Sequence, residues 1–195
     1  MKKFGCITLD MEAEETGQPN FADQLLRVFA KIPMTCFSFP GGRWSDSPCH
    51  EHGLHLHPSL GHKLSNPDGL KSFRAEGLNH ELFKCADLAA AGIKVNASYS
   101  ARRFPGESAL ASESGVRRII TCASADLGGE HVAKWLNDLS NWPLLVVIGH
   151  DYMPLTAQGF WTAYTIFREQ GRELVPVGAL ADRGEEQVGR RAAVS

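Results

Sequence analysis

The sequence predicts an α/β domain built as a distorted (β/α) barrel of seven or eight strands. Short apolar runs rich in β-branched and aromatic residues alternate along the chain with segments of helical periodicity. Polar side chains follow directly on several of these runs, at the strand ends where barrels of this type place their sites. Strands are expected at 4–9, 34–39, 51–57, 72–75, 93–98, 118–122, 144–148 and 173–177. Helices are expected at 21–31, 79–91, 130–139 and 156–170.

Turn and capping residues set the expected boundaries. The helix at 21–31 has an apolar stripe on one face and Asn20 as a candidate cap. Gly92 closes the helix at 79–91 as a C-cap. The segment 102–115 has no clear period and is predicted to be an irregular excursion. Residues 1–183 are expected to form a single domain, followed by a polar C-terminal tail at 184–195.

Composition excludes several classes of protein. The net charge of −2 comes from interspersed acidic and basic residues, which argues against nucleic acid as a partner. No apolar run approaches the ~20 residues that span a bilayer. The five cysteines are odd in number and have no CxxC spacing, which argues against a disulfide framework and a thiolate zinc site. The N-terminus lacks the features of a signal peptide, so a cytoplasmic protein is expected.

Two carboxylates stand at the end of the first strand. Asp10 and Glu12 are two positions apart, so their side chains face the same side of an extended chain. At the mouth of a barrel, one carboxylate can bind a metal while the other takes a proton from water. The alternative is structural: Glu12 belongs with Glu14 and Glu15 to a solvated loop, and Asp10 merely ends the strand.

Four histidines lie within positions 50–57. His55 and His57 end the third strand and project together, so both ring nitrogens can bind one divalent ion. His50 and His52 have the same spacing but lie at the beginning of the strand, at the other end of the barrel. The alternative is that these are core histidines satisfied by their neighbours.

Three further polar residues follow strands. Arg74 can hold a carboxylate ionised, or it can form a surface pair with Glu76. His150 comes directly after the most apolar run and is a candidate general acid, with a structural histidine as the alternative. Asp126 follows another strand, where it can line the site or cap a helix.

The order of these motifs resembles that of the polysaccharide deacetylase family, over about residues 4–180. Thr-Leu-Asp-Met-Glu at 8–12 is similar to the family's first motif, Thr-Phe-Asp-Asp, whose first Asp is the catalytic base. Glu-His-Gly-Leu-His-Leu-His-Pro at 51–58 resembles the second motif, which supplies the metal histidines. Phe-Arg-Ala-Glu-Gly at 73–77 is similar to the third, whose Arg orients the base. Val-Val-Ile-Gly-His at 146–150 resembles the fifth, whose His is the general acid.

The resemblance implies Asp10, Arg74 and His150 as catalytic residues, and Glu12, His55 and His57 as ligands of a divalent metal, zinc by expectation. Two positions depart from the family pattern. The second Asp of the first motif is Met11 here, so Glu12 replaces it; the usual second metal histidine is Ser59, so His57 serves instead. The fourth motif is not placed.

The first hypothesis for function is a metal-dependent hydrolase of C–N bonds that deacetylates an N-acetylated sugar or a sugar-containing precursor. Its partner is a small-molecule or oligosaccharide substrate, and the oligomeric state stays open, with a homo-oligomer among the options. The second hypothesis is a metal-dependent phosphoesterase or other amidohydrolase on a barrel. The third is a non-catalytic barrel that binds carbohydrate or metal.

Overall fold

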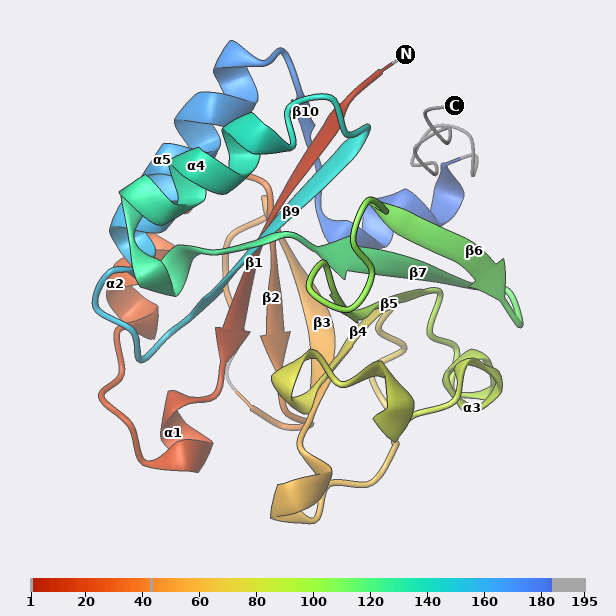
Figure 1. The fold of residues 1–195 in the computed structure, drawn as a ribbon. Helices are drawn as coiled ribbons and strands as arrows, with labels where there is room; N and C mark the ends of the chain where they lie inside the picture. The colour runs from red at the N-terminus through yellow and green to blue at the C-terminus, as the bar shows by residue number, and fades with distance from the viewer. Residues whose placement is uncertain (1, 43, 184–195) are drawn as a thin grey trace.

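The computed structural model describes residues 2–42 and 44–183, in which a ten-stranded sheet curls into a distorted barrel (Figure 1). The polar tail expected at 184–195 lies outside the described residues. The strands are β1 (Phe4–Met11), β2 (Met34–Ser38), β3 (His50–Leu56), β4 (Ser72–Ala75), β5 (Val95–Ser100), β6 (Ala109–Glu113), β7 (Val116–Thr121), β8 (Ala123–Ser124), β9 (Leu144–His150) and β10 (Glu173–Leu174).

Helices cover the outside of the sheet. The α-helices are α1 (Ala13–Thr16), α2 (Ala22–Val28), α3 (Cys85–Ala90), α4 (Gly129–Asp138) and α5 (Thr156–Glu169). In Figure 1, α2, α4 and α5 lie together on one side of the sheet and α3 lies on another. Short 3-10 turns complete the chain: η1 (Pro58–Leu60), η2 (Glu76–Leu78), η3 (His80–Leu82), η4 (Ala125–Leu127) and η5 (Val177–Asp182). No helix in the described ranges has the length and apolarity needed to cross a membrane.

One continuous segment joins the two ends of the curled sheet. The strand order is β6-β7-β5-β4-β3-β2-β1-β9-β8, and β10 pairs with β1. Strand β7 pairs with β5, whereas β8, which follows it after Cys122, pairs with β9. Residues 116–124 therefore pair with β5 near one end of the strand series and with β9 near the other. The expected α/β barrel is confirmed.

The side chains of β1 alternate between two cores, as the pleat of a strand requires. Ile7, Leu9 and Met11 pack outward in a cluster that also contains residues of α2, α4 and α5. Phe4 and Cys6 belong to a second cluster with residues of β9 and η5. A third cluster joins α3 to β3 and β4. Because Asp10 has the same parity as Phe4 and Cys6, it faces inward at the carboxyl end of β1.

Three expected elements were wrong in part. The excursion at 102–115 contains β6, which forms an antiparallel hairpin with β7 through Ser114 and Gly115, both at positive φ. The helix expected at 79–91 is η3 followed by α3. Between them Phe83 is extended and packs on Phe73, with ring centroids 5.1 Å apart, so tertiary packing overrides helix propensity.

The strand expected at 173–177 is only two residues long. Pro176 has no N–H to donate to a ladder. The next two N–H groups bond to side chains instead: Val177 N donates to Thr35 Oγ1 over 2.8 Å, and Gly178 N donates to Glu51 Oε2 over 2.7 Å. The chain therefore turns into η5, whose Val177 and Leu180 pack in the same apolar cluster as Phe4 of β1.

Candidate metal-binding active site

Glu12, His55 and His57 converge at the carboxyl ends of β1 and β3. Glu12 Oε2 lies 2.7 Å from His57 Nε2 and 3.3 Å from His55 Nε2, and the two ring nitrogens are 3.0 Å apart. All three residues are buried. Burial by itself raises the pKa of Glu12, but hydrogen bonds from the two imidazoles, together with the charges of His55 and His150, outweigh it and hold that pKa well below its usual range.

The chemistry of this cluster fits a divalent metal ion. Each of the three residues offers one ligand atom, and the three atoms lie within 4.8 Å of one another. Metal–ligand bonds of about 2.0–2.1 Å place ligand atoms about 2.9–3.4 Å apart, which is close to the spacing found here. Two imidazoles and one carboxylate suit zinc and other first-row transition metals.

The orientation of the His55 ring is fixed from behind. Its Nδ1–H donates to the carbonyl of Arg74 over 3.0 Å, which holds Nε2 toward the cluster, 3.3 Å from Glu12 Oε2, in the position of a metal ligand. Phe39 stacks on the His55 ring, with centroids 5.6 Å apart, and contacts the edge of His57 at 5.2 Å. The register of the sheet explains the contact with Arg74, because His55 pairs directly with that residue across β3 and β4.

A buried ion pair lies beside the cluster. Arg74 is fully buried and its Nη1 donates to Asp10 Oδ1 over 2.6 Å and to Thr8 Oγ1 over 2.9 Å. The guanidinium also lies 4.4 Å from the ring centroid of Phe37. The other carboxylate oxygen, Asp10 Oδ2, faces the cluster and is 3.8 Å from His55 Nε2. This full burial excludes the surface pair with Glu76.

His150 faces the same centre from β9. Its Nε2 lies 3.5 Å from Glu12 Oε1 and 3.9 Å from Asp10 Oδ2, and its Nδ1 is 2.6 Å from Asp126 Oδ2. The register pairs Asp10 with His150 across β1 and β9. Burial disfavours the imidazolium, but the hydrogen bond to Asp126 and the charges of Asp10, Asp126 and Glu12 raise the pKa of His150 to about 9.

Asp126 holds His150 in place. It accepts from the His150 backbone N–H over 2.8 Å and from Thr156 Oγ1 over 2.8 Å. Of the two alternatives for Asp126, the structure decides against helix capping, since the N-cap residue of α4 is Gly128 and no side chain caps this helix. Close packing makes these bonds geometrically possible: a Cβ on Gly159 of α5 would lie 2.4 Å from the Ala125 carbonyl oxygen.

Solved structures with a similar fold are known, whereas sequence comparisons give no match. No protein-family model and no curated protein matches the sequence. Among solved structures, a polysaccharide deacetylase from Bacillus cereus is similar, with 14% identity and a TM-score of 0.51 over 90% of this chain and 92% of that one. The chain has the polysaccharide deacetylase fold. A proposed polysaccharide deacetylase involved in O-antigen biosynthesis in Bordetella bronchiseptica is also similar, with 13% identity and a TM-score of 0.49 over 97% of this chain and 84% of that one.

The structure brings all six sequence-predicted site residues to one centre: Asp10, Glu12, His55, His57, Arg74 and His150. Sequence reasoning missed Asp151, whose Oδ1 accepts from the backbone N–H groups of Glu12 and Ala13 over 3.1 and 3.0 Å. Burial, helped by the Glu12 charge, raises the pKa of Asp151 to about 6.

Tyr152 was also missed. Its ring lies 5.2 Å from that of His150, and burial together with the Glu12 charge raises the pKa of its hydroxyl. The signal that can find these two residues is their position directly after His150, at the end of a buried strand.

Proposed function

We propose that this chain is a divalent metal-dependent hydrolase of C–N bonds that removes the acetyl group from an N-acetylated sugar. The observation that supports this best is the convergence of three chemically distinct units on one centre. These are the Glu12, His55 and His57 cluster, the Asp10–Arg74 pair and the His150–Asp126 pair. In the reaction, water adds to the amide carbonyl, the C–N bond breaks, and acetate and a free amine leave.

Asp10 is the proposed base that takes the proton from the attacking water. Arg74 engages Oδ1, so the carboxylate cannot rotate and Oδ2 stays directed at the centre. The guanidinium also makes this a charge-assisted hydrogen bond, which holds a carboxylate in place more strongly than a neutral donor does. The position of Asp10 on a buried strand fixes its distance from the reacting carbonyl, which is a main source of rate enhancement.

His150 is the proposed acid that protonates the departing nitrogen. Asp126 accepts from Nδ1–H, which leaves the Nε2–H directed at the centre. Its pKa of about 9 keeps this proton bound at neutral pH, so the acid is in the correct state before the C–N bond breaks.

Glu12, His55 and His57 would hold the metal, which we propose to be zinc; when bound, it would polarise the amide carbonyl and lower the pKa of water. The Arg74 carbonyl and the Phe39 ring keep the two imidazoles in the ligating orientation without it. The similarity to the polysaccharide deacetylase from Bacillus cereus supports an N-acetyl sugar or oligosaccharide as the substrate.

The test is release of acetate and free amine from N-acetylglucosamine and its short oligomers, with zinc-loaded and chelator-treated protein. Activity should depend on metal and fall by about a thousandfold or more in Asp10→Asn, which should keep its metal because the three ligands are untouched. A generic phosphoester serves as the competing substrate. Phosphate release without acetate release would favour the phosphoesterase, and metal binding without any turnover would favour the non-catalytic barrel.

A further inference from the structure

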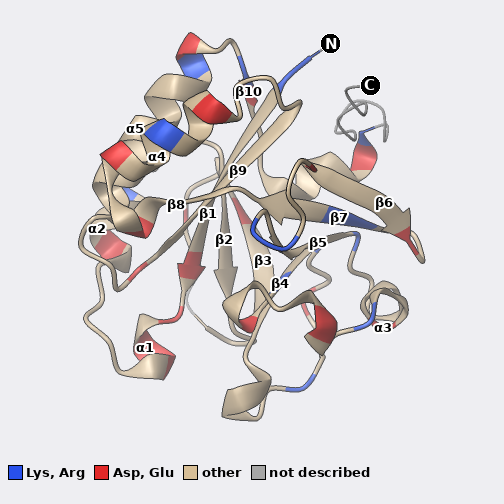
Figure 2. Ribbon diagram, in the orientation of Figure 1, with Lys and Arg blue, Asp and Glu red and all other residues tan. Residues whose placement is uncertain are grey.

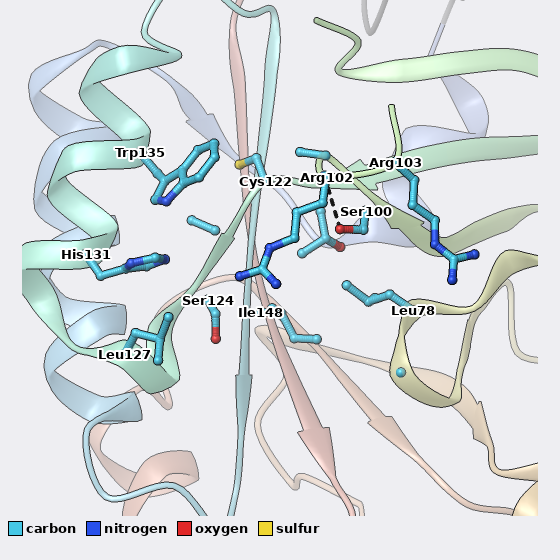
Figure 3. A pocket seen from close by; sticks show the side chains of 14 residues that line it. Leu78, Ser100, Arg102, Arg103, Cys122, Ser124, Leu127, His131, Trp135 and Ile148 are labelled. Carbon is cyan, nitrogen blue, oxygen red and sulfur yellow. Dashed lines mark hydrogen bonds between the residues drawn. The ribbon is translucent and has the colours of Figure 1, made fainter. Parts of the chain in front are cut away.

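A pocket of about 340 Å³ opens beside the active site, between the loop after β5 and helix α4 (Figure 3). One wall carries the rings of His131 and Trp135 from α4, both half-buried, with centroids 6.3 Å apart. On the opposite side the pocket is lined by Arg102, Arg103 and Leu78. A volume of this size accommodates a small-molecule fragment.

The floor of the pocket leads to His150, the proposed acid. Ser124 lines the pocket, and its hydroxyl donates to Asp126 Oδ2 over 3.0 Å, the same oxygen that bonds His150. Ile148 also lines the pocket and lies two residues before His150 on β9, so both side chains face the same side of the strand. A molecule whose amide nitrogen lies at His150 can therefore extend past Ile148 into this pocket.

Arg102 is positioned to bind a ligand rather than to support the fold. Its side chain is exposed, and among residues 2–42 and 44–183 it has no acidic partner within ion-pair distance. Figure 3 shows it reaching over the pocket toward the His131 side, whereas Arg103 points away. In Figure 2 this loop is blue, while the end of β1 at the active site is red.

The opposite flank of the active site has the reverse charge. A second pocket of about 360 Å³ lies between the end of β1 and the loop after β2. Its described lining residues include the acids Glu14, Glu15 and Asp151 and none that is basic. A substrate that carries a negative charge is repelled by this flank and attracted by the other, so the two pockets together orient it across the catalytic centre.

We propose that the substrate is an anionic N-acyl amino sugar, bearing a phosphate or a carboxylate, whose charged group is bound by Arg102 in the pocket beside α4. The guanidinium fork matches either oxyanion in a bidentate geometry, and the Trp135 ring offers an apolar face to the sugar. This inference rests on the proposed function for the position of the amide, and it adds the class of substrate.

The experiment compares N-acetylglucosamine 1-phosphate, N-acetylglucosaminuronic acid and uncharged N-acetylglucosamine. Binding of each to metal-free protein is measured by calorimetry, and turnover is measured with zinc-loaded enzyme. Arg102→Gln should raise Kd and KM for the charged sugars by about tenfold and leave the uncharged sugar within about twofold. Arg168→Gln, which removes the same charge from the exposed face of α5, should change neither.

The two charged sugars identify which oxyanion the pocket prefers. Equal affinity for charged and uncharged sugars, or a preference for charge that persists in Arg102→Gln, overturns the inference. If the uncharged sugar is hydrolysed and Arg102→Gln has no selective effect, the proposed function stands and only the pocket assignment fails. If no sugar is hydrolysed but Arg102 still controls binding of the charged sugars, the pocket assignment stands and the deacetylase proposal fails.

Discussion

Two His-x-His pairs lie at the two ends of β3, the second ending one residue after the strand, and their surroundings differ in every contact. His55 and His57 occupy odd positions, face inward and meet the carboxylate of Glu12. His50 and His52 occupy even positions and face the other side of the strand. His52 and His55 are three positions apart, and this odd offset places one pair inside the barrel and the other outside it.

The outer pair is satisfied by neutral groups. His50 Nε2–H donates to the carbonyl of Phe29 over 3.0 Å, and its Nδ1 lies 2.5 Å from Ser45 Oγ. Burial lowers the pKa of His50, so its ring is neutral. His52 donates to the Ser45 carbonyl over 2.9 Å and stacks on Trp44, with centroids 4.5 Å apart. The spacing of two histidines thus identifies a candidate metal site only together with the side of the strand they face.

The largest expected effect is on metal affinity. Loss of a residue that only contacts a metal ligand typically weakens metal binding by about 10–100-fold. His55→Gln or His57→Gln removes a ligand itself, so each should weaken zinc binding by more than that. The matched controls His50→Gln and His52→Gln should leave the zinc Kd within about twofold. Competition titration with a chromophoric chelator measures all four. Equal losses in both pairs would contradict the assignment of the inner pair as ligands.

His150 is the third histidine that faces inward, and the carboxylate of Asp126 orients its ring, whereas a backbone carbonyl orients the ring of His55. The folded-state pKa of His150, about 9, lies above its usual 6.5. Its contribution to stability is therefore complete below pH 6.5 and is lost as pH rises through 9. Without metal, the free energy of unfolding should fall by about 3 kcal/mol across this range.

Asp126→Asn removes the hydrogen bond that raises this pKa most, so this pH dependence should largely disappear in that variant. Urea titrations at pH 6.5 and pH 9 measure both proteins. If the free energy of unfolding of Asp126→Asn falls with pH as steeply as that of the wild type, another group causes the pH dependence.

Glu51, also inward on β3, should affect stability without affecting the metal. Its carboxylate accepts from Thr35, Ser72 and the N–H of Gly178. Glu51→Ala leaves these donors unpaired and should cost about 2 kcal/mol at pH 7, with zinc affinity unchanged. Glu51→Gln keeps an acceptor and should cost less.

The two variants at position 51 also differ in their response to pH. Burial raises the pKa of Glu51, so its contribution to stability is lost as pH rises above its usual 4.5. The free energy of unfolding of Glu51→Gln, measured by denaturant titration, should therefore rise relative to that of the wild type between pH 4.5 and pH 7. A constant difference between them would contradict the raised pKa.

The smallest expected effect concerns the outer pair. His52→Gln loses the stack on Trp44 and should lower the free energy of unfolding by about 0.5–1 kcal/mol. Thermal unfolding of zinc-loaded protein detects this as a shift of a few degrees. A larger loss, accompanied by loss of zinc, would mean that the outer pair takes part in the metal site.

The sequence predicts most of this site because the ends of buried strands can be located from the pattern of apolar residues. Asp10 and His150 each follow an apolar run, His55 lies near the end of β3, and parallel strands bring such positions to one edge. Residues two positions apart on a strand face the same side, so Asp10 predicts Glu12 and His55 predicts His57 as members of the site.

What the sequence could not supply depends on tertiary packing. The bond from His150 to Asp126 joins residues 24 apart and requires the close approach at Gly159, which no local pattern encodes. The basic pocket likewise forms only where the loop after β5 meets α4, and the sequence places Arg102 in a segment without a clear period. Strand β6 was missed because it is short and lies at the edge of the sheet, although the Ser-Gly dipeptide at 114–115 is a turn signal.

The pairing of β1 has a consequence for synthesis of the protein on the ribosome. One edge of β1 pairs with β2 over residues 8–11 and with β10 over residues 4–5, whereas its other edge pairs with β9, which begins at Leu144. The nascent chain therefore carries an apolar strand with one free edge until most of the polypeptide has emerged, and such edges promote aggregation. Truncations that remove β9 should accumulate as insoluble material rather than as a smaller folded unit.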